Sequence, residues 1–208
     1  MPPARRRRPS RRSYHHGNLR RALLDEALAI IRTEGVAGVT LREIGARVGV
    51  SRTALYRHFA DKRALLVAVA TEGFRTLREQ LVSAWEGSGG GIAGFEAHGL
   101  AYVRFAVGSP AHYRVMFGGM ADHDVEDPEL TEQGHGAFQS LLDVLTDLQR
   151  VGLVRRDDTL VMAEYVWAVV HGVAMLAIDR QLVNRPDVEA FTRYAISRLA
   201  TGLASPEA

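Results

Sequence analysis

Apolar residues recur at intervals of three and four positions along most of the chain, which is the spacing of an amphipathic α-helix. The first such segment starts at Asn18 and stops at Gly35, because glycine readily adopts the left-handed conformation that ends many helices. Its apolar face consists of Leu19, Ala22, Leu23, Ala27, Ile30 and Ile31. No segment has the strict alternation of a half-buried strand. The pattern therefore predicts an all-α protein.

Two short helices separated by a glycine turn are predicted next. Thr40 is a suitable N-cap for the first, which spans residues 41–48. Ser51 is a suitable N-cap for the second, residues 52–59. Gly49 lies in the turn between them, and this arrangement is typical of a helix-turn-helix.

The remaining helices follow the same signals. Asp61 caps a long helix that extends to about residue 85, and the glycine-rich stretch 87–91 predicts a surface loop after it. Further helices are expected at about 92–107, 111–117, 128–151, 159–182 and 186–203. The fold is thus expected to contain about nine helices, with a three-helix N-terminal unit and a larger helical C-terminal unit.

The net charge of +2 conceals a division of charge along the chain. Residues 1–63 carry 15 Lys and Arg against 5 Asp and Glu, whereas residues 64–208 carry 11 against 19. A basic first third indicates a polyanionic partner. The absence of cysteine excludes disulfides, thiolate zinc sites and thiol catalysis, and it fits a cytoplasmic protein.

Residues 1–16 are predicted to form a disordered basic arm, since residues 1–13 hold six arginines and three prolines without apolar periodicity. Two interpretations of the arm remain open. It could lie in the DNA minor groove, where negative potential favours arginine. It could equally be a solvated tail that adds only nonspecific attraction.

The second short helix has few residues suited to a core. Leu55 and Phe59 form its apolar side, and the opposite side is centred on Thr53 and Arg57. The first residues of a recognition helix contact base edges in the major groove, and Arg, Thr and Ala can each contact a base there. The alternative is a helical hairpin with a solvated polar face. The candidate DNA-binding residues are Thr40, Arg42, Ser51, Arg52, Thr53, Ala54, Tyr56, Arg57, His58 and Lys62.

The segment from His16 to Phe74 resembles the DNA-binding domain of TetR/AcrR-type transcriptional regulators. Its specific features are the VTLREIGARVGVS turn, the LYRHFADK block and the Leu-Leu pair that follows. The resemblance implies an all-α dimer that usually represses transcription until a small molecule binds its C-terminal domain. It also implies that Tyr56 and Lys62 contact phosphates and that residues 51–54 face bases. The stretch WAVVHG at 167–172 is similar to the Trp…His-Gly signature of one C-terminal subgroup.

We therefore expect a basic arm at 1–16, a DNA-binding domain at 17–77 and a regulatory domain for ligand binding and dimerisation at 78–208. The candidate ligand-binding residues are Tyr102, Phe105, Tyr113, Met116, Phe117, Phe138, Trp167, His171 and Met175, with Met120 and Tyr165 as further aromatic or sulfur-containing positions. Such a stripe is also typical of an ordinary core. His171 could bond a ligand, a backbone carbonyl or a buried partner.

A symmetric DNA site requires a dimer. The helix predicted at 159–182 is apolar nearly all round and that at 186–203 is amphipathic, so we expect the two to pair with their copies in a four-helix interface. Small residues that would allow close packing are Ala168, Gly172, Ala174, Ala195 and Gly202. Glu164 and His171 make a membrane span unfavourable, and no membrane partner is expected.

No catalytic triad, paired carboxylate or phosphate loop is found in a usable context, so neither enzymatic activity nor a cofactor is expected. The acidic stretch 122–127 is interpreted as a solvated loop and not as a metal site. The leading hypothesis is a homodimeric regulator that binds a pseudo-palindromic double-stranded operator and is released by a small, mostly apolar effector. The alternative is an architectural or nonspecific DNA-binding protein without an effector. The helix-turn-helix alone does not separate a repressor from an activator.

Overall fold

The computed structural model describes residues 16–118, 127–184 and 187–204. The expectations for the arginine-rich arm, for Met120 and for residues 122–126 fall outside these ranges. Within them the chain is all-α, as predicted, apart from one isolated bridge between Val154 and Ala204. The helices are α1 (His16–Glu34), the 3-10 turn η1 (Val36–Gly38), α2 (Leu41–Val48), α3 (Arg52–Tyr56), α4 (Lys62–Gly87), α5 (Gly91–Gly108), α6 (Pro110–Phe117), α7 (Pro128–Arg150), α8 (Thr159–Ile178) and α9 (Val188–Leu203).

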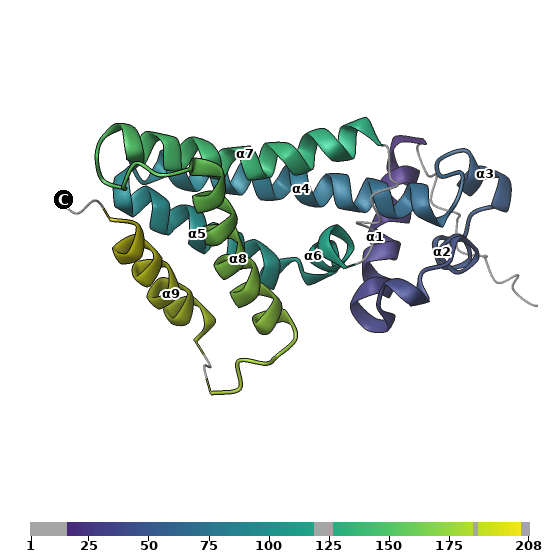
Figure 1. Ribbon diagram of the computed structural model, residues 1–208. Helices are drawn as coiled ribbons and strands as arrows, with labels where there is room; N and C mark the ends of the chain where they lie inside the picture. Colours follow the sequence, from purple (N-terminus) through teal and green to yellow (C-terminus); the bar gives the residue numbers. More distant parts are fainter. Residues whose placement is uncertain (1–15, 119–126, 185–186, 205–208) are drawn as a thin grey trace, which may run out of the picture.

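The long helix α4 joins the two ends of the molecule. Helices α1, α2 and α3 cluster around its N-terminal end, while α7 runs beside it (Figure 1). Helices α5, α8 and α9 pack together at its other end, and α6 lies between them and α1 (Figure 1). The domain boundary suggested at residue 77 falls inside α4, which continues to Gly87 without a break. The division into domains stays a prediction.

The N-terminal unit is held by a compact apolar core. Leu23, Ile30, Ile44 and Leu65 are all fully buried, and they come from α1, α2 and α4. Burying a side chain of this size stabilises a fold by roughly 1.5–3 kcal/mol. Leu55, also buried, anchors the short α3 to this core. The rest of α3 is therefore free to remain exposed.

The turn between α2 and α3 requires a glycine. Gly49 has φ 76° and ψ 34°, the left-handed region, and its N–H donates to the Gly45 carbonyl at 3.0 Å. The caps expected from the sequence are confirmed on both sides: the Thr40 side chain accepts from the Glu43 N–H, and the Ser51 side chain accepts from the Ala54 N–H.

We expect Gly49→Ala to lower the free energy of unfolding by about 1–2 kcal/mol, because a Cβ is unfavourable at this positive φ. No atom lies within 4 Å of the added methyl group, so the cost is conformational and not steric. Gly87→Ala is the matched control: it also has open space around its Cβ, but its φ is ordinary. Urea unfolding of both variants checks this, and equal midpoints for the two would contradict it.

Several predicted helix boundaries differ from the structure. The first helix begins at His16 instead of Asn18, and α4 ends at Gly87 instead of about residue 85. The recognition helix ends at Tyr56 instead of Phe59, since the chain tightens there with a bond from the His58 N–H to the Leu55 carbonyl, 2.9 Å, before α4 starts. Helix α8 ends at Ile178 instead of Leu182, because the chain turns at Arg180 with φ 57°. The last helix begins at Val188, with Asp187 as its N-cap.

Candidate DNA interface and ligand cavity

One candidate site is the surface of α3. Ser51, Arg52, Thr53, Tyr56 and Arg57 are exposed along it, whereas Ala54 and His58 are half-buried. The guanidinium of Arg52 lies 5.6 Å from the centre of the Tyr56 ring. This cation–π contact orients the arginine along the exposed face, which lowers the entropy lost when it binds. The candidate residues of α3 therefore share one accessible surface.

Exposed arginines of the N-terminal unit differ in their availability. Arg42, on α2, is exposed beside α3. Arg47, by contrast, is held by three carboxylates, those of Glu43 at 2.8 Å, Glu34 at 3.0 Å and Glu26 at 3.3 Å. These carboxylates neutralise it and raise its pKa. Arg42 is thus accessible for binding DNA, whereas Arg47 is already paired with carboxylates.

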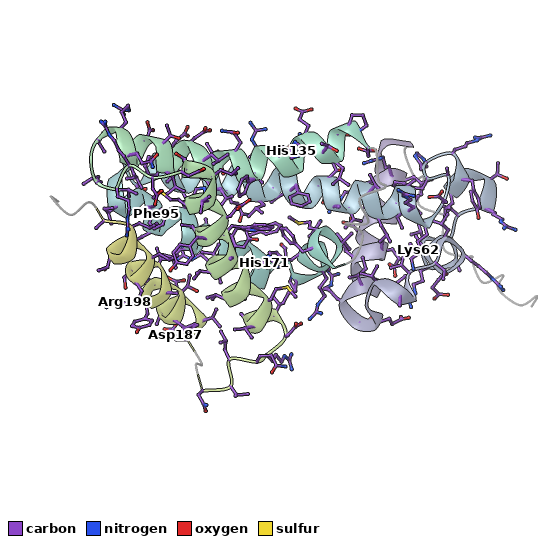
Figure 2. All side chains as sticks on the ribbon, viewed as in Figure 1. Lys62, Phe95, His135, His171, Asp187 and Arg198 are labelled. Atoms are coloured by element: carbon purple, nitrogen blue, oxygen red, sulfur yellow. The ribbon has the colours of Figure 1, made fainter. Side chains whose placement is uncertain are left out.

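The candidate Lys62 has an internal role in the fold. Its Nζ donates to the carbonyl oxygens of Val36, 2.9 Å, and Ala37, 3.4 Å, and so ties η1 to the start of α4. Figure 2 shows Lys62 inside the N-terminal unit rather than at its tip. An ammonium has three donors, which leaves one for a phosphate oxygen.

We expect Lys62→Met to lower the free energy of unfolding by about 1–2 kcal/mol, because two hydrogen bonds are lost, one part-buried and one exposed. If its third donor also binds a phosphate, the variant should bind all DNA more weakly, and the slope of log K against log salt should fall by about one unit per subunit. Urea unfolding and salt titrations of DNA binding measure the two effects separately. A loss of stability with an unchanged slope would exclude the phosphate contact.

The second candidate site is a cavity of about 370 Å³ lined by residues of α4, α5, α6, α7, α8 and α9. Its volume lies at the lower end of the ~300–1,000 Å³ usual for ligand sites. Four of the candidate ligand-binding residues line it: Tyr102, Phe117, Phe138 and Trp167. Five lie outside its wall: Phe105, Tyr113, Met116, His171 and Met175. Of these, Met116 packs against Gly73, and Phe105 belongs to the buried core.

A chain of hydrogen bonds closes the α6 end of the cavity. Trp167 Nε1 donates to Tyr102 Oη at 3.1 Å, the two tyrosine hydroxyls lie 3.0 Å apart, and Tyr113 Oη lies 2.7 Å from His171 Nδ1. Burial lowers the pKa of His171 and raises the pKa of Tyr102 to about 12. The groups are therefore neutral, and His171 Nδ1 shares a hydrogen bond with the Tyr113 hydroxyl. Of the three partners considered for His171, the structure places it against buried side chains, between α8 and α6 (Figure 2).

The cavity also contains residues that the sequence analysis missed. Phe74, Leu77 and Leu81 lie on one side of α4, and His98 and Gly99 come from α5. The spacing of the three α4 residues, i, i+3 and i+7, was a usable signal, because it continues an apolar stripe beyond the helix-turn-helix unit. Nothing local distinguishes His98, which hydrogen-bonds Ser140 on α7, 42 positions later.

Helix α6 links the cavity to the DNA-binding end. Its Tyr113 joins the hydrogen-bond chain, while His112 Nε2 lies 3.3 Å from the Glu72 carboxylate on α4. Both oxygens of Glu72 also accept from Arg21 on α1, at 2.7 and 2.8 Å. A shift of α6 would therefore disturb side-chain contacts with both α4 and α1.

Helix α8 has three distinct sides. One faces the core, including Ala174, which is fully buried and so cannot belong to the expected dimer interface. The second, with Glu164 and Trp167, lines the cavity. The third, which we call the outer stripe, is exposed or half-buried and consists of Val161, Tyr165, Ala168, Gly172 and Leu176. Tyr165 thus points away from the cavity.

The outer stripe leaves much apolar surface uncovered. Helix α8 is long and apolar enough to cross a membrane, yet only 33% of its apolar eighteen-residue stretch is buried. Tyr194 on α9 is also exposed, with the Arg198 guanidinium 5.6 Å from its ring centre. Figure 2 shows Arg198 on the outer side of α9. An apolar surface of this kind marks an interaction site.

The acidic stretch that was considered as a metal site is only partly described. Asp127 caps α7, with its carboxylate accepting from the Leu130 N–H at 2.8 Å. Among the residues that the structure describes, no group of three His, Asp or Glu side chains is arranged to hold a metal.

Two sequence families match this chain. Residues 23–69 match "Bacterial regulatory proteins, tetR family", and residues 95–199 match "Tetracyclin repressor-like, C-terminal domain". The class C tetracycline repressor protein of Escherichia coli is 45% identical over 51 residues, 24% of this chain and 23% of the repressor. The chain thus aligns with less than a quarter of that repressor's length. The uncharacterized HTH-type transcriptional regulator YobS of Bacillus subtilis (strain 168) is 24% identical over 90% of this chain and 93% of its own.

Solved structures share the whole fold. A protein of unknown function from Rhodococcus sp. RHA1 is 32% identical and superposes with a TM-score of 0.84, covering 94% of this chain and 100% of that one. The transcriptional regulator FadR of Bacillus subtilis, solved in complex with stearoyl-CoA, has a TM-score of 0.70 over 88% of this chain and 98% of its own. Its identity of 15% makes this a likeness of fold alone.

Proposed function

Because the chain belongs to the TetR family of transcriptional regulators and carries that family's DNA-binding domain, we propose that it is a homodimeric repressor released from its operator by a small, mostly apolar effector. The observation that carries this proposal is the pairing of two sites on α4. The polar face of α3 lies at one end of that helix, and the apolar cavity lies along its other half. As such a regulator it works in the cytoplasm, has no catalytic activity and needs no cofactor or membrane.

Residues 52–54 meet base edges in the major groove, while the Ser51 and Tyr56 hydroxyls bind phosphates. Arg57 is exposed on the same face and adds positive charge to it. The Ser51 hydroxyl accepts from the Ala54 N–H at 3.2 Å, so its hydrogen remains able to donate to a phosphate oxygen. Thr40 caps α2 in the same way, which places a helix N-terminus where a phosphate can dock. Arg42 and His58 complete the contact surface.

Control by an effector follows from the position of α6. Filling the cavity displaces Phe117, which lines it, and with it the other residues of α6. His112 then pulls on Glu72 and Arg21, and the N-terminal unit turns relative to α4. Two recognition helices enter successive major grooves only when they are about 34–36 Å apart. An effector that binds better to the misaligned dimer therefore shifts the population off DNA.

The dimer forms through the outer stripe of α8 together with the exposed side of α9. The outer stripe is apolar, and the exposed side of α9 presents Tyr194 between Arg193 and Arg198. The two surfaces lie on adjacent helices and contain small residues at Ala168, Gly172 and Gly202 that permit close helix contact. Pairing of the two helices with their copies buries the apolar side of α8 without a membrane. Ala195 is half-buried and lies at the edge of this surface.

The relatives support control by an effector without identifying it. The tetracycline repressors and FadR, solved in complex with stearoyl-CoA, are associated by name with different small molecules, which supports a small-molecule effector for this chain. Repression is favoured over activation because the tetracycline repressors are named for it.

The test is selection of bound fragments from a genomic library, followed by affinity measurements at one stated salt concentration. A specific operator should bind roughly 10³–10⁷ times more tightly than random DNA of equal length. The alternative function, an architectural protein without an effector, requires nearly equal affinities for the two DNAs. Equal binding would therefore reject the regulator and favour the alternative.

A further inference from the structure

His98 lines the cavity, and its ring nitrogen Nδ1 has no hydrogen-bond partner among the described residues, whereas its Nε2 is bound to Ser140. We propose that the effector is a neutral, mostly apolar molecule carrying a hydroxyl group, and that this hydroxyl donates its hydrogen to His98 Nδ1. The inference rests on the proposed function of the cavity as the effector site. It adds the chemical class of the effector and the residue that selects it.

The hydrogen-bond geometry around Ser140 determines which imidazole nitrogen is free. The Ser140 hydroxyl has one hydrogen, and it donates this to the Ala137 carbonyl at 2.7 Å. Ser140 Oγ therefore accepts at its second contact, 3.2 Å from His98 Nε2, and the donor there is the imidazole N–H. Burial lowers the pKa of His98 to about 4, so the ring is neutral at physiological pH. With the proton on Nε2, Nδ1 carries a lone pair and can only accept.

The free nitrogen opens into the cavity. His98 is only 5% exposed, and within the described chain nothing donates to its Nδ1. Yet none of the fully enclosed side-chain nitrogens and oxygens in the described ranges lacks a hydrogen-bond partner. The unpaired Nδ1 must therefore touch open space, and the cavity is the space that His98 lines. A ligand that leaves this atom desolvated and unpaired loses affinity.

The other polar groups of the cavity favour a neutral ligand. The Tyr102 hydroxyl already accepts from Trp167 and lies within hydrogen-bond distance of both Tyr113 and His171, so it is engaged within the protein and not with a carboxylate. No lysine or arginine lines the described part of the wall, and its ionisable residues besides His98 and Tyr102 are His135 and Glu164, both exposed. An anion would lose its hydration without gaining a cation. A ligand hydroxyl, in contrast, finds the acceptor it needs.

Three probes of nearly equal shape separate the alternatives on the full-length protein: biphenyl-4-ol, 4-methoxybiphenyl and biphenyl-4-carboxylate. The first can donate a hydrogen bond, the second can only accept, and the third is charged. In calorimetric titrations we expect biphenyl-4-ol to bind at least about tenfold more tightly than either of the others. Tightest binding of the carboxylate, equal binding of the methyl ether, or no binding of biphenyl-4-ol would each overturn the inference.

Two variants of His98 distinguish its nitrogens. In His98→Gln the carboxamide reaches the Nε2 position and keeps a partner for Ser140, but nothing remains at Nδ1. In His98→Asn the amide oxygen takes the Nδ1 position and the Ser140 contact is lost. We expect the preference for biphenyl-4-ol over its methyl ether to fall below about threefold in His98→Gln and to persist in His98→Asn. If the preference for biphenyl-4-ol persisted in His98→Gln, Nδ1 would not be the atom that accepts the ligand hydroxyl.

Thermal unfolding establishes that each variant is folded, and the wild-type comparison of the three probes stands without any variant. Release from the selected operator is measured separately with biphenyl-4-ol. A hydroxyl preference without release would reject the effector role in the proposed function and leave the hydroxyl-binding site intact. Release by both neutral probes without a preference would overturn the inference and leave the proposed function standing.

Discussion

Arg52→Ala is expected to weaken operator binding by about 2–6 kcal/mol, because each lost bidentate base contact costs about 1–3 kcal/mol and a dimer makes two of them. The side chain is exposed at the first turn of α3 and is held over the Tyr56 ring, so it reaches the groove in a preferred orientation. Binding to random DNA should change much less, since phosphate contacts supply most of that affinity.

The measurement is a titration of the selected operator and of a scrambled DNA with wild type and variant at the same salt concentration. Arg150→Ala is a matched control, because Arg150 is exposed at the end of α7, far from α3, and forms an ion pair with its neighbour Asp147. Arg52→Lys keeps the charge and removes the bidentate geometry, so it should recover nonspecific but not specific affinity. Equal losses on both DNAs would assign Arg52 to a phosphate.

Features set by neighbouring residues are those that the sequence predicted correctly. The caps at Thr40 and Ser51 need only a side-chain oxygen three positions before an unpaired N–H, and the turn at Gly49 needs only a residue that tolerates positive φ. The end of α8 was wrong by four residues, because it is set by the turn at Arg180, where no glycine marks the change.

Features set by contacts between distant segments were the ones missed. The sequence predicts Lys62 to be a surface cation. Its ammonium, however, donates to the carbonyl oxygens of Val36 and Ala37, which lie 26 and 25 positions earlier in the chain. His171 and Met175 share a helix face with Trp167, but Trp167 alone of the three lines the cavity. In a helical sequence pattern, an apolar residue that lines a cavity cannot be told from one in a packed core. The cavity exists only because of how several helices pack against each other. The Trp…His-Gly subgroup likewise stays a prediction.

The outer stripe of α8 leads to the second large effect. Val161→Glu is expected to convert the dimer to a monomer at micromolar concentration, since two unpaired carboxylates, one from each copy, would enter an apolar interface at a cost of several kcal/mol. Two linked recognition helices bind a palindrome far more tightly than one, so operator affinity should fall by about 100-fold or more. The fold itself should survive, because Val161 is 60% exposed in the single chain.

Val151→Glu provides the control with the same chemical change. Val151 is 54% exposed, but it lies in the turn after α7, outside the outer stripe. Sedimentation equilibrium should find a dimer for this variant and a monomer for Val161→Glu, and operator titrations should follow the same order. A dimeric Val161→Glu with wild-type operator affinity would show that the two copies meet elsewhere. The apolar side of α8 would then require a different partner, because an exposed surface of that composition is unfavourable in water.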